Sequence, residues 1–157
     1  GTLGGVRSGD FKYKWEGKYC TAVNEAVDGD VDGNYVTGIL PRNVSPSNRT
    51  RVLIRESNYH PDGGQVFFPK NNDPYVAVLA LPNENVQLKD FVAFYCDGSF
   101  GINIYADVWH QPLYPINNEA VILGKQGAVH ACVSLDTVEE FGKYLAIPLT
   151  KPTHAVG

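Results

Sequence analysis

The sequence has no apolar run near the roughly 20 residues that a membrane-spanning helix needs. Its longest apolar run, residues 75–81, has the length of a buried strand, so no membrane partner is expected. A surplus of positive charge is also missing, because 13 Lys and Arg residues stand against 17 Asp and Glu residues, a net charge of -4. The basic residues are scattered, which argues against a nucleic-acid partner.

Cysteine is scarce as well. Cys20, Cys96 and Cys132 are odd in number and unrelated in spacing, so we interpret them as reduced, buried thiols of a cytoplasmic protein. Two N-glycosylation triplets, at residues 43–45 and 48–50, favour secretion instead. They lie in a Pro-rich polar loop, where such triplets arise by chance. We therefore predict a cytoplasmic location.

The composition is that of a globular protein, with 43% hydrophobic and 19% charged residues in 157 positions. This length predicts a single domain over residues 1–157, and no repeat or linker divides it. Residues 1–10 are expected to be a flexible tail or a cloning remnant.

Short β-branched and aromatic runs alternate with turn sequences such as "PDGG" and "KNNDP", which is typical of a β-sandwich or barrel. Helix is predicted only at residues 136–145, where Asp136 can open a capping box and Val138, Phe141 and Leu145 share a face. Residues 84–90 could add a turn. The predicted strands are residues 35–40, 51–56, 65–69, 75–81, 91–96, 100–105, 108–110, 120–123 and 128–134.

Two of the four histidines are candidates for a site. His154 is near the C-terminal end and is expected to be disordered. His130 lies inside an apolar run, which indicates a structural role. His60 and His110 each adjoin a turn and a proline, and loops at the mouth of a rigid β scaffold commonly carry sites.

The Gly-rich turn after His60 leads into a strand that Gln65 opens, so the two side chains can converge. A hairpin with solvated polar ends is the alternative. In "GINIYADVWH", His110 can join Asn103 on one face only if the chain bends near Asp107, a residue that favours turns. Trp109 could equally be a core aromatic.

This order of residues resembles the double motif of cupin barrels, in which a first histidine group and a later histidine bind a metal. The corresponding positions are Asn58, His60, Gln65 and His110. The resemblance implies a double-stranded β-helix, or jelly-roll barrel, with one or two short peripheral helices. Because amides replace two usual ligands and bind divalent metals weakly, it implies at most a weakly held divalent metal on His60, Gln65 and His110.

The stretches "YHPDGGQVFFP", "YVAVLAL" and "FVAFYCDGSFGINIYADVWHQPL", in this order, are similar to the ureidoglycolate lyase family. The resemblance covers about residues 35–132. It implies a urea-releasing carbon–nitrogen lyase that splits (S)-ureidoglycolate, a small carboxylate, into glyoxylate and urea during allantoin and purine breakdown. It also implies a homodimer.

Family positions imply that His60 and His110 act as acid and base, or as metal ligands. Lys125 would pair with the substrate carboxylate, with Lys70 as a second candidate. The residues expected to bind the substrate are Gln65, Asn103, Tyr105, Gln111 and Lys125.

The sequence departs from the family pattern at several polar positions. Gln111 and Tyr105 stand where the family has histidines, and residues 124–127 read "GKQG" in place of "DRGG". A lysine cannot make the two-pronged contact of an arginine with a carboxylate. Two alternatives therefore stay open: a cupin enzyme acting on another small hydroxy or oxo acid, and a non-catalytic cupin that binds a small molecule.

Overall fold

The structure is a computed structural model that describes residues 6–16, 19–24, 51–127 and 131–153, the first two ranges as backbone only. The strand expected at residues 35–40, the two glycosylation triplets, His130 and His154 lie outside the described residues. No helix in the described part of the chain has the length and apolar composition needed to cross a bilayer.

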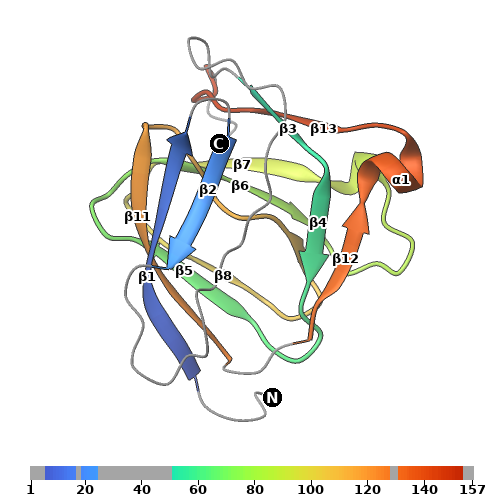
Figure 1. Cartoon of the computed structure of the whole chain (residues 1–157), viewed down its shortest axis with the longest axis horizontal. Coiled ribbons are helices and arrows are strands. Elements are labelled where there is room, and N and C mark those ends of the chain that lie inside the picture. The colour runs from blue at the N-terminus through green and yellow to red at the C-terminus, as the bar shows by residue number, and fades with distance from the viewer. Residues whose placement is uncertain (1–5, 17–18, 25–50, 128–130, 154–157) are drawn as a thin grey trace.

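The described chain is mainly β, with one short helix, α1 (Thr137–Phe141), and one 3-10 turn, η1 (Leu88–Asp90). Figure 1 shows the strands wrapped around a common interior, with α1 at the periphery beside β12. The strands are β1 (Val6–Glu16), β2 (Tyr19–Asn24), β3 (Arg51–Ile54), β4 (Glu56–Tyr59), β5 (Gln65–Pro69), β6 (Tyr75–Ala80), β7 (Val92–Cys96), β8 (Ile102–Ile104), β9 (Trp109–His110), β10 (Tyr114–Pro115), β11 (Glu119–Gly127), β12 (Val133–Asp136) and β13 (Leu145–Pro148).

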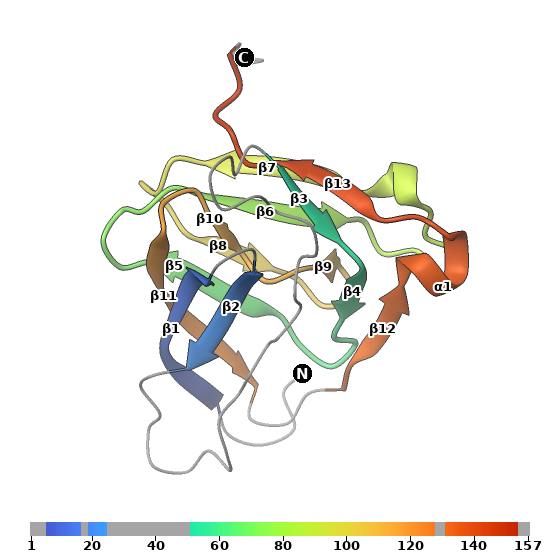
Figure 2. The ribbon, with the colours of Figure 1, turned by 45° about the horizontal axis from the view of Figure 1, so that its top comes forward.

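The strands form two larger sheets and one small one, all antiparallel (Figure 2). One sheet has the order β2-β1-β11-β5-β8, and the other has the order β10-β6-β9-β4-β12, with β7 also paired to β6. The pair β13-β3 completes the fold. This arrangement confirms the predicted β-barrel class.

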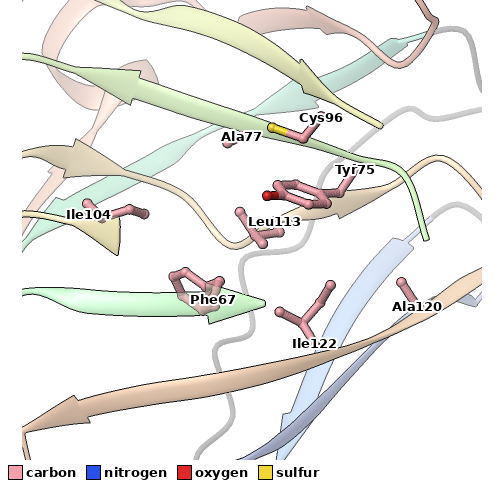
Figure 3. Close-up of a cluster of buried hydrophobic side chains, with 8 residues drawn as sticks. All are labelled: Phe67, Tyr75, Ala77, Cys96, Ile104, Leu113, Ala120 and Ile122. Carbon is pink, nitrogen blue, oxygen red and sulfur yellow. The ribbon is translucent and has the colours of Figure 1, made fainter. Parts of the chain in front are cut away.

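The main core lies between the inner faces of the two larger sheets (Figure 3). β5 alternates buried and exposed residues, so Gln65 and Phe67 point inward while Val66 and Phe68 point outward. β6 is buried on both faces, with Tyr75 in the main core and Val76 in a second core under β3 and β13. Burial on both faces explains why β6 is a continuous apolar run rather than an alternating one.

The predicted helix is shorter than expected. Asp136 caps α1 by accepting hydrogen bonds from the backbone N–H groups of Val138 and Glu139, and Gly142 ends it in the left-handed region at φ 67°. Leu145, expected on the helix face, lies in β13 instead. Gly142 lies between Phe141, the last helical residue, and Leu145. Because the helix stops at this glycine, Leu145 belongs to the strand that follows.

Asp136 also forms an ion pair with Arg55, with Nε and Oδ2 2.6 Å apart. Partial burial acts to raise the pKa of Asp136. Hydrogen bonds from the backbone of Glu139, from Arg55 and from the backbone of Val138 outweigh it, so the pKa of this carboxyl is lowered.

Three further predictions need correction. Residues 6–10, expected to belong to a tail, are part of β1, which pairs with β11 from Val6 to Lys14. The strand predicted at residues 120–123 extends over nine residues in β11. The strand predicted at residues 128–134 begins only at Val133, as far as the described residues show.

Candidate active site

The two candidate histidines come from neighbouring strands of one sheet. His110 lies in β9, where it is the register partner of Asn58 in β4. His60 follows β4, two residues after Asn58. Directly opposed residues, and residues two apart in a strand, point to the same face of a sheet. The three side chains are therefore directed to one side.

The imidazole rings of His60 and His110 lie against each other, with centroids 4.9 Å apart and planes tilted by 59°. Both side chains are buried, at 6% and 5% exposure. The predicted convergence of these two histidines is thus present in the structure, while their chemical role stays a prediction.

Each ring is oriented by the main chain. Nδ1 of His60 is 2.9 Å from the carbonyl oxygen of Ala131, and Nδ1 of His110 is 2.9 Å from that of Val108. A carbonyl oxygen only accepts, so Nδ1 must carry the proton in both hydrogen bonds. The neutral form of each ring then has its lone pair on Nε2, the atom that can take up a proton or bind a metal.

The bend expected near Asp107 is present. Asp107 has φ 64°, in the left-handed region that Asp tolerates better than most residues, and the N–H of Val108 donates to the carbonyl of Tyr105. The N–H of Asp107 donates to the carbonyl of His60 at 3.1 Å. This turn therefore fastens the segment before β9 to the segment after β4 and brings the two histidines together.

A buried pair of amides lies on the inner face of the other sheet. Gln65 and Gln126 are register partners in β5 and β11, and Nε2 of Gln65 donates to Oε1 of Gln126 at 2.7 Å. Their exposures are only 4% and 5%. Gln126 is not among the predicted site residues. Neighbouring residues of a strand face opposite ways, so a strand through Lys125 and Gln126 would have indicated that one of the two faces the interior.

The amide pair and the imidazole pair border the same core. Gln65 is the register partner of Ile104, which belongs to the main core, and His110 is the partner of Leu79, which packs against that core. Partners directly opposed in a sheet share a face. The interior between the sheets therefore has imidazoles on one wall and amides on the other.

Asn103 and Lys125, which are predicted to bind the substrate, do not line this interior, and their role stays a prediction. Both are register partners of Val66, which points outward, and both are exposed. Tyr105 lies in the turn before β9 and is 73% exposed. His110 therefore faces the same interior as Gln65, whereas Asn103, on the other sheet, faces outward.

Gln111 is fully buried, and its Nε2 donates to the main-chain carbonyl of Glu56. It thus holds the chain after β9 against β4, while its predicted contact with the substrate stays a prediction. Its Oε1 has no hydrogen-bond partner in the described part of the chain. Lys70, the second candidate for carboxylate binding, is exposed.

Trp109 points away from the imidazoles and confirms the core interpretation. It packs edge-on against Tyr59, with ring centroids 4.6 Å apart, and its indole N–H donates to the carbonyl of Asn83. A cavity of about 320 Å³ adjoins this side and is lined by Tyr59, Pro82, Asn83, Glu84 and Asp107. The histidines are not among its lining residues, so we do not assign the chemistry to it.

The donor set fits a firmly held metal poorly. In the described residues no three His, Cys, Asp or Glu side chains are grouped so that they could hold a metal ion. The other two positions of the cupin-like motif are amides. Asn58 has a buried Oδ1 with no hydrogen-bond partner in the described chain, and Gln65 donates its Nε2–H to Gln126. Amide oxygens are weak ligands for transition metals. We therefore derive no chemical step through a metal.

Cysteine chemistry is not favoured in this core either. Cys96 is 3% exposed, and burial raises the pKa of its thiol, which keeps it in the poorly nucleophilic protonated form. Burial likewise raises the pKa of Tyr75, whose hydroxyl donates to the carbonyl of Phe100.

Fold and site together define a β-barrel protein with a buried pair of imidazoles. A family model described as ureidoglycolate lyase matches residues 28–140, most of the chain. The chain therefore belongs to the ureidoglycolate lyase family.

Individual relatives match over a shorter stretch. Proteins named ureidoglycolate lyase from Salmonella enteritidis and from Salmonella newport (strain SL254) are each 35% identical to this chain over 63 residues. That stretch is 40% of this chain and 39% of each relative, so the alignment spans about two fifths of their length.

Proposed function

We propose that the protein is a lyase that cleaves (S)-ureidoglycolate into glyoxylate and urea, as a step in allantoin breakdown. The observation that carries this proposal is the buried contact of His60 with His110, each held through Nδ1 by a main-chain carbonyl. Family membership supports the choice of substrate.

The reaction needs one proton removed and one delivered. The substrate carries a hydroxyl and a ureido nitrogen on the same carbon. Nε2 of one neutral imidazole takes the hydroxyl proton, the oxygen forms the aldehyde C=O, and the C–N bond breaks with its electrons going to nitrogen. The second ring, entering as imidazolium, gives that nitrogen a proton and completes urea. The two rings end with exchanged protonation states, so the protons balance.

Two adjacent buried rings suit this exchange. A base and an acid must reach atoms on either side of one carbon, and the ring centroids are 4.9 Å apart. Preorganisation by the Ala131 and Val108 carbonyls fixes which nitrogen faces the substrate.

The test is glyoxylate release from racemic and (S)-ureidoglycolate by the purified protein, with His60→Ala, His110→Ala and Lys125→Ala beside it. We expect turnover that each histidine substitution lowers by a factor of about 10² to 10⁴, and that the outward-facing Lys125→Ala leaves within twofold. Absence of turnover from the folded wild type, with chelator and with added Ni²⁺, Mn²⁺ or Zn²⁺, would refute the lyase proposal.

We further propose a cytoplasmic homodimer. Cys96 and Cys132 form no disulfide in the described part of the chain, which supports the compartment. An apolar outer face supports the dimer: Phe68 and Leu123 are register partners on β5 and β11 and are 47% and 45% exposed, next to Val66 at 40%. Sedimentation of the wild type and of Phe68→Lys tests the dimer, which should dissociate in the variant. A monomeric wild type would rule it out.

A further inference from the structure

We propose that Gln126, together with Gln65, forms the subsite that recognises the ureido group, so that Gln126 determines specificity. The inference rests on the proposed lyase function and assigns one end of its substrate to one wall of the barrel. It concerns a residue that the family motif does not point to, since the motif aligns Lys125 with the family's arginine.

The amide pair has hydrogen-bonding capacity beyond its internal bond. The bond of 2.7 Å uses one N–H of Gln65 and the carbonyl oxygen of Gln126. By chemical inventory, the oxygen of Gln65 and the NH₂ group of Gln126 are a further acceptor and a further donor. The bond holds the two amides together at a fixed register between β5 and β11.

A ureido group is complementary to this pair. It is planar and neutral, and it has a carbonyl oxygen beside N–H donors. Gln126 can donate to the oxygen, and Gln65 can accept from the terminal NH₂. A carboxylate has no N–H donor for the oxygen of Gln65, so the same amide pair would bind it more weakly. In a buried site, a ligand that leaves such groups unpaired is strongly disfavoured.

The surrounding residues favour the same orientation. The buried polar side chains of the described chain are serine, threonine, histidine and glutamine, with no Lys or Arg among them. Among the described residues, the imidazoles are thus the buried basic side chains, and the hydroxyl and carboxylate belong at that wall. The uncharged ureido end is then left to the amide wall across the core that Ile104 and Leu79 border.

The test compares unreactive ligands by calorimetry on the full chain. N-carbamoylglycine is the substrate without its hydroxyl, and glycolate keeps the hydroxyl and carboxylate but has no ureido group. In Gln126→Met we expect N-carbamoylglycine to bind about tenfold more weakly, while the affinity for glycolate stays within twofold. Lys125→Met is the matched control, the same replacement one residue away on the outer face, and should leave both affinities within twofold.

Equal weakening of both ligands, or no change in either, would overturn the inference. A second measurement needs no variant: N-acetylglycine, which has a methyl in place of the terminal NH₂, should bind the wild type about tenfold more weakly than N-carbamoylglycine. Equal affinities, or no binding of N-carbamoylglycine, would also overturn it. The protein does not turn over any of these ligands, so their binding can be compared whether or not it cleaves ureidoglycolate. A failure of the proposed lyase function would appear in the glyoxylate assay and not in these affinities.

Discussion

Ser57 links the strand β4 to the main chain of the candidate catalytic residue His110. Its hydroxyl donates to the carbonyl of His110 at 3.0 Å, and the side chain is fully buried. Ser57→Ala removes this donor while deleting only one atom, so packing around it changes little. The variant therefore measures the hydrogen bond itself.

The expected magnitude depends on what else holds this carbonyl. A buried hydrogen bond contributes about 0.5–1.5 kcal/mol net, whereas a carbonyl stripped of every partner costs about 1–3 kcal/mol. His110 is flanked in its sheet by Asn58 and by Leu79, so β9 is also held by strand pairing on both sides. The smaller figure applies, and we expect the free energy of unfolding to fall by about 1 kcal/mol, or Tm by about 2–4 °C.

Guanidinium chloride unfolding, followed by circular dichroism, measures this loss; urea is avoided because it is the proposed product. The midpoint should fall while the slope m stays unchanged. Ser99→Ala is the control, since the exposed Ser99 hydroxyl donates to the nearby carboxylate of Asp97 and its loss should cost about 0.5 kcal/mol or less. A Ser57→Ala midpoint equal to that of wild type, or a loss above about 3 kcal/mol, would refute the reasoning.

Leu113→Ala should destabilise the protein by about 2–5 kcal/mol in the same assay, because Leu113 is fully buried between the two larger sheets. Asp136→Asn keeps a capping side chain but loses the charge beside Arg55. The lowered pKa of Asp136 contributes stability above the unfolded value of 3.8 that is lost as the pH falls through the folded value, so the variant's deficit should shrink in acid. Cys132 is exposed, contrary to the predicted burial of all three thiols, so iodoacetamide should modify it in the native protein and modify buried Cys96 only after unfolding, as peptide mass mapping would show.

The sequence predicts best those strands in which the order of apolar and polar residues follows directly from which faces are buried. β5 alternates from Gln65 to Pro69, and β6 is apolar throughout because a core covers each face. The turn at Asp107 could also be anticipated, since the chain must bend there for His110 to meet its partner. Local chemistry was sufficient in these places.

Other features depend on pairing that no local pattern contains. "GKQG" has the composition of a turn, yet it continues β11 because β5 and β1 pair with it on both sides. The choice of Lys125 over Gln126 followed from aligning the lysine with an arginine. Successive residues of a strand point to opposite faces, so Gln126 faces the interior while Lys125 faces outward.

The change from ligating side chains to amides alters what the barrel can use to accelerate a reaction. A metal would stabilise developing charge directly, but an amide carries no charge and only donates or accepts hydrogen bonds. In the proposed mechanism, proton transfer comes from His60 and His110, and binding energy comes from the amide wall. Such a site discriminates by donor and acceptor pattern rather than by charge. It follows that the neutral ureido end, more than the carboxylate shared by many small acids, should set which substrate this barrel accepts.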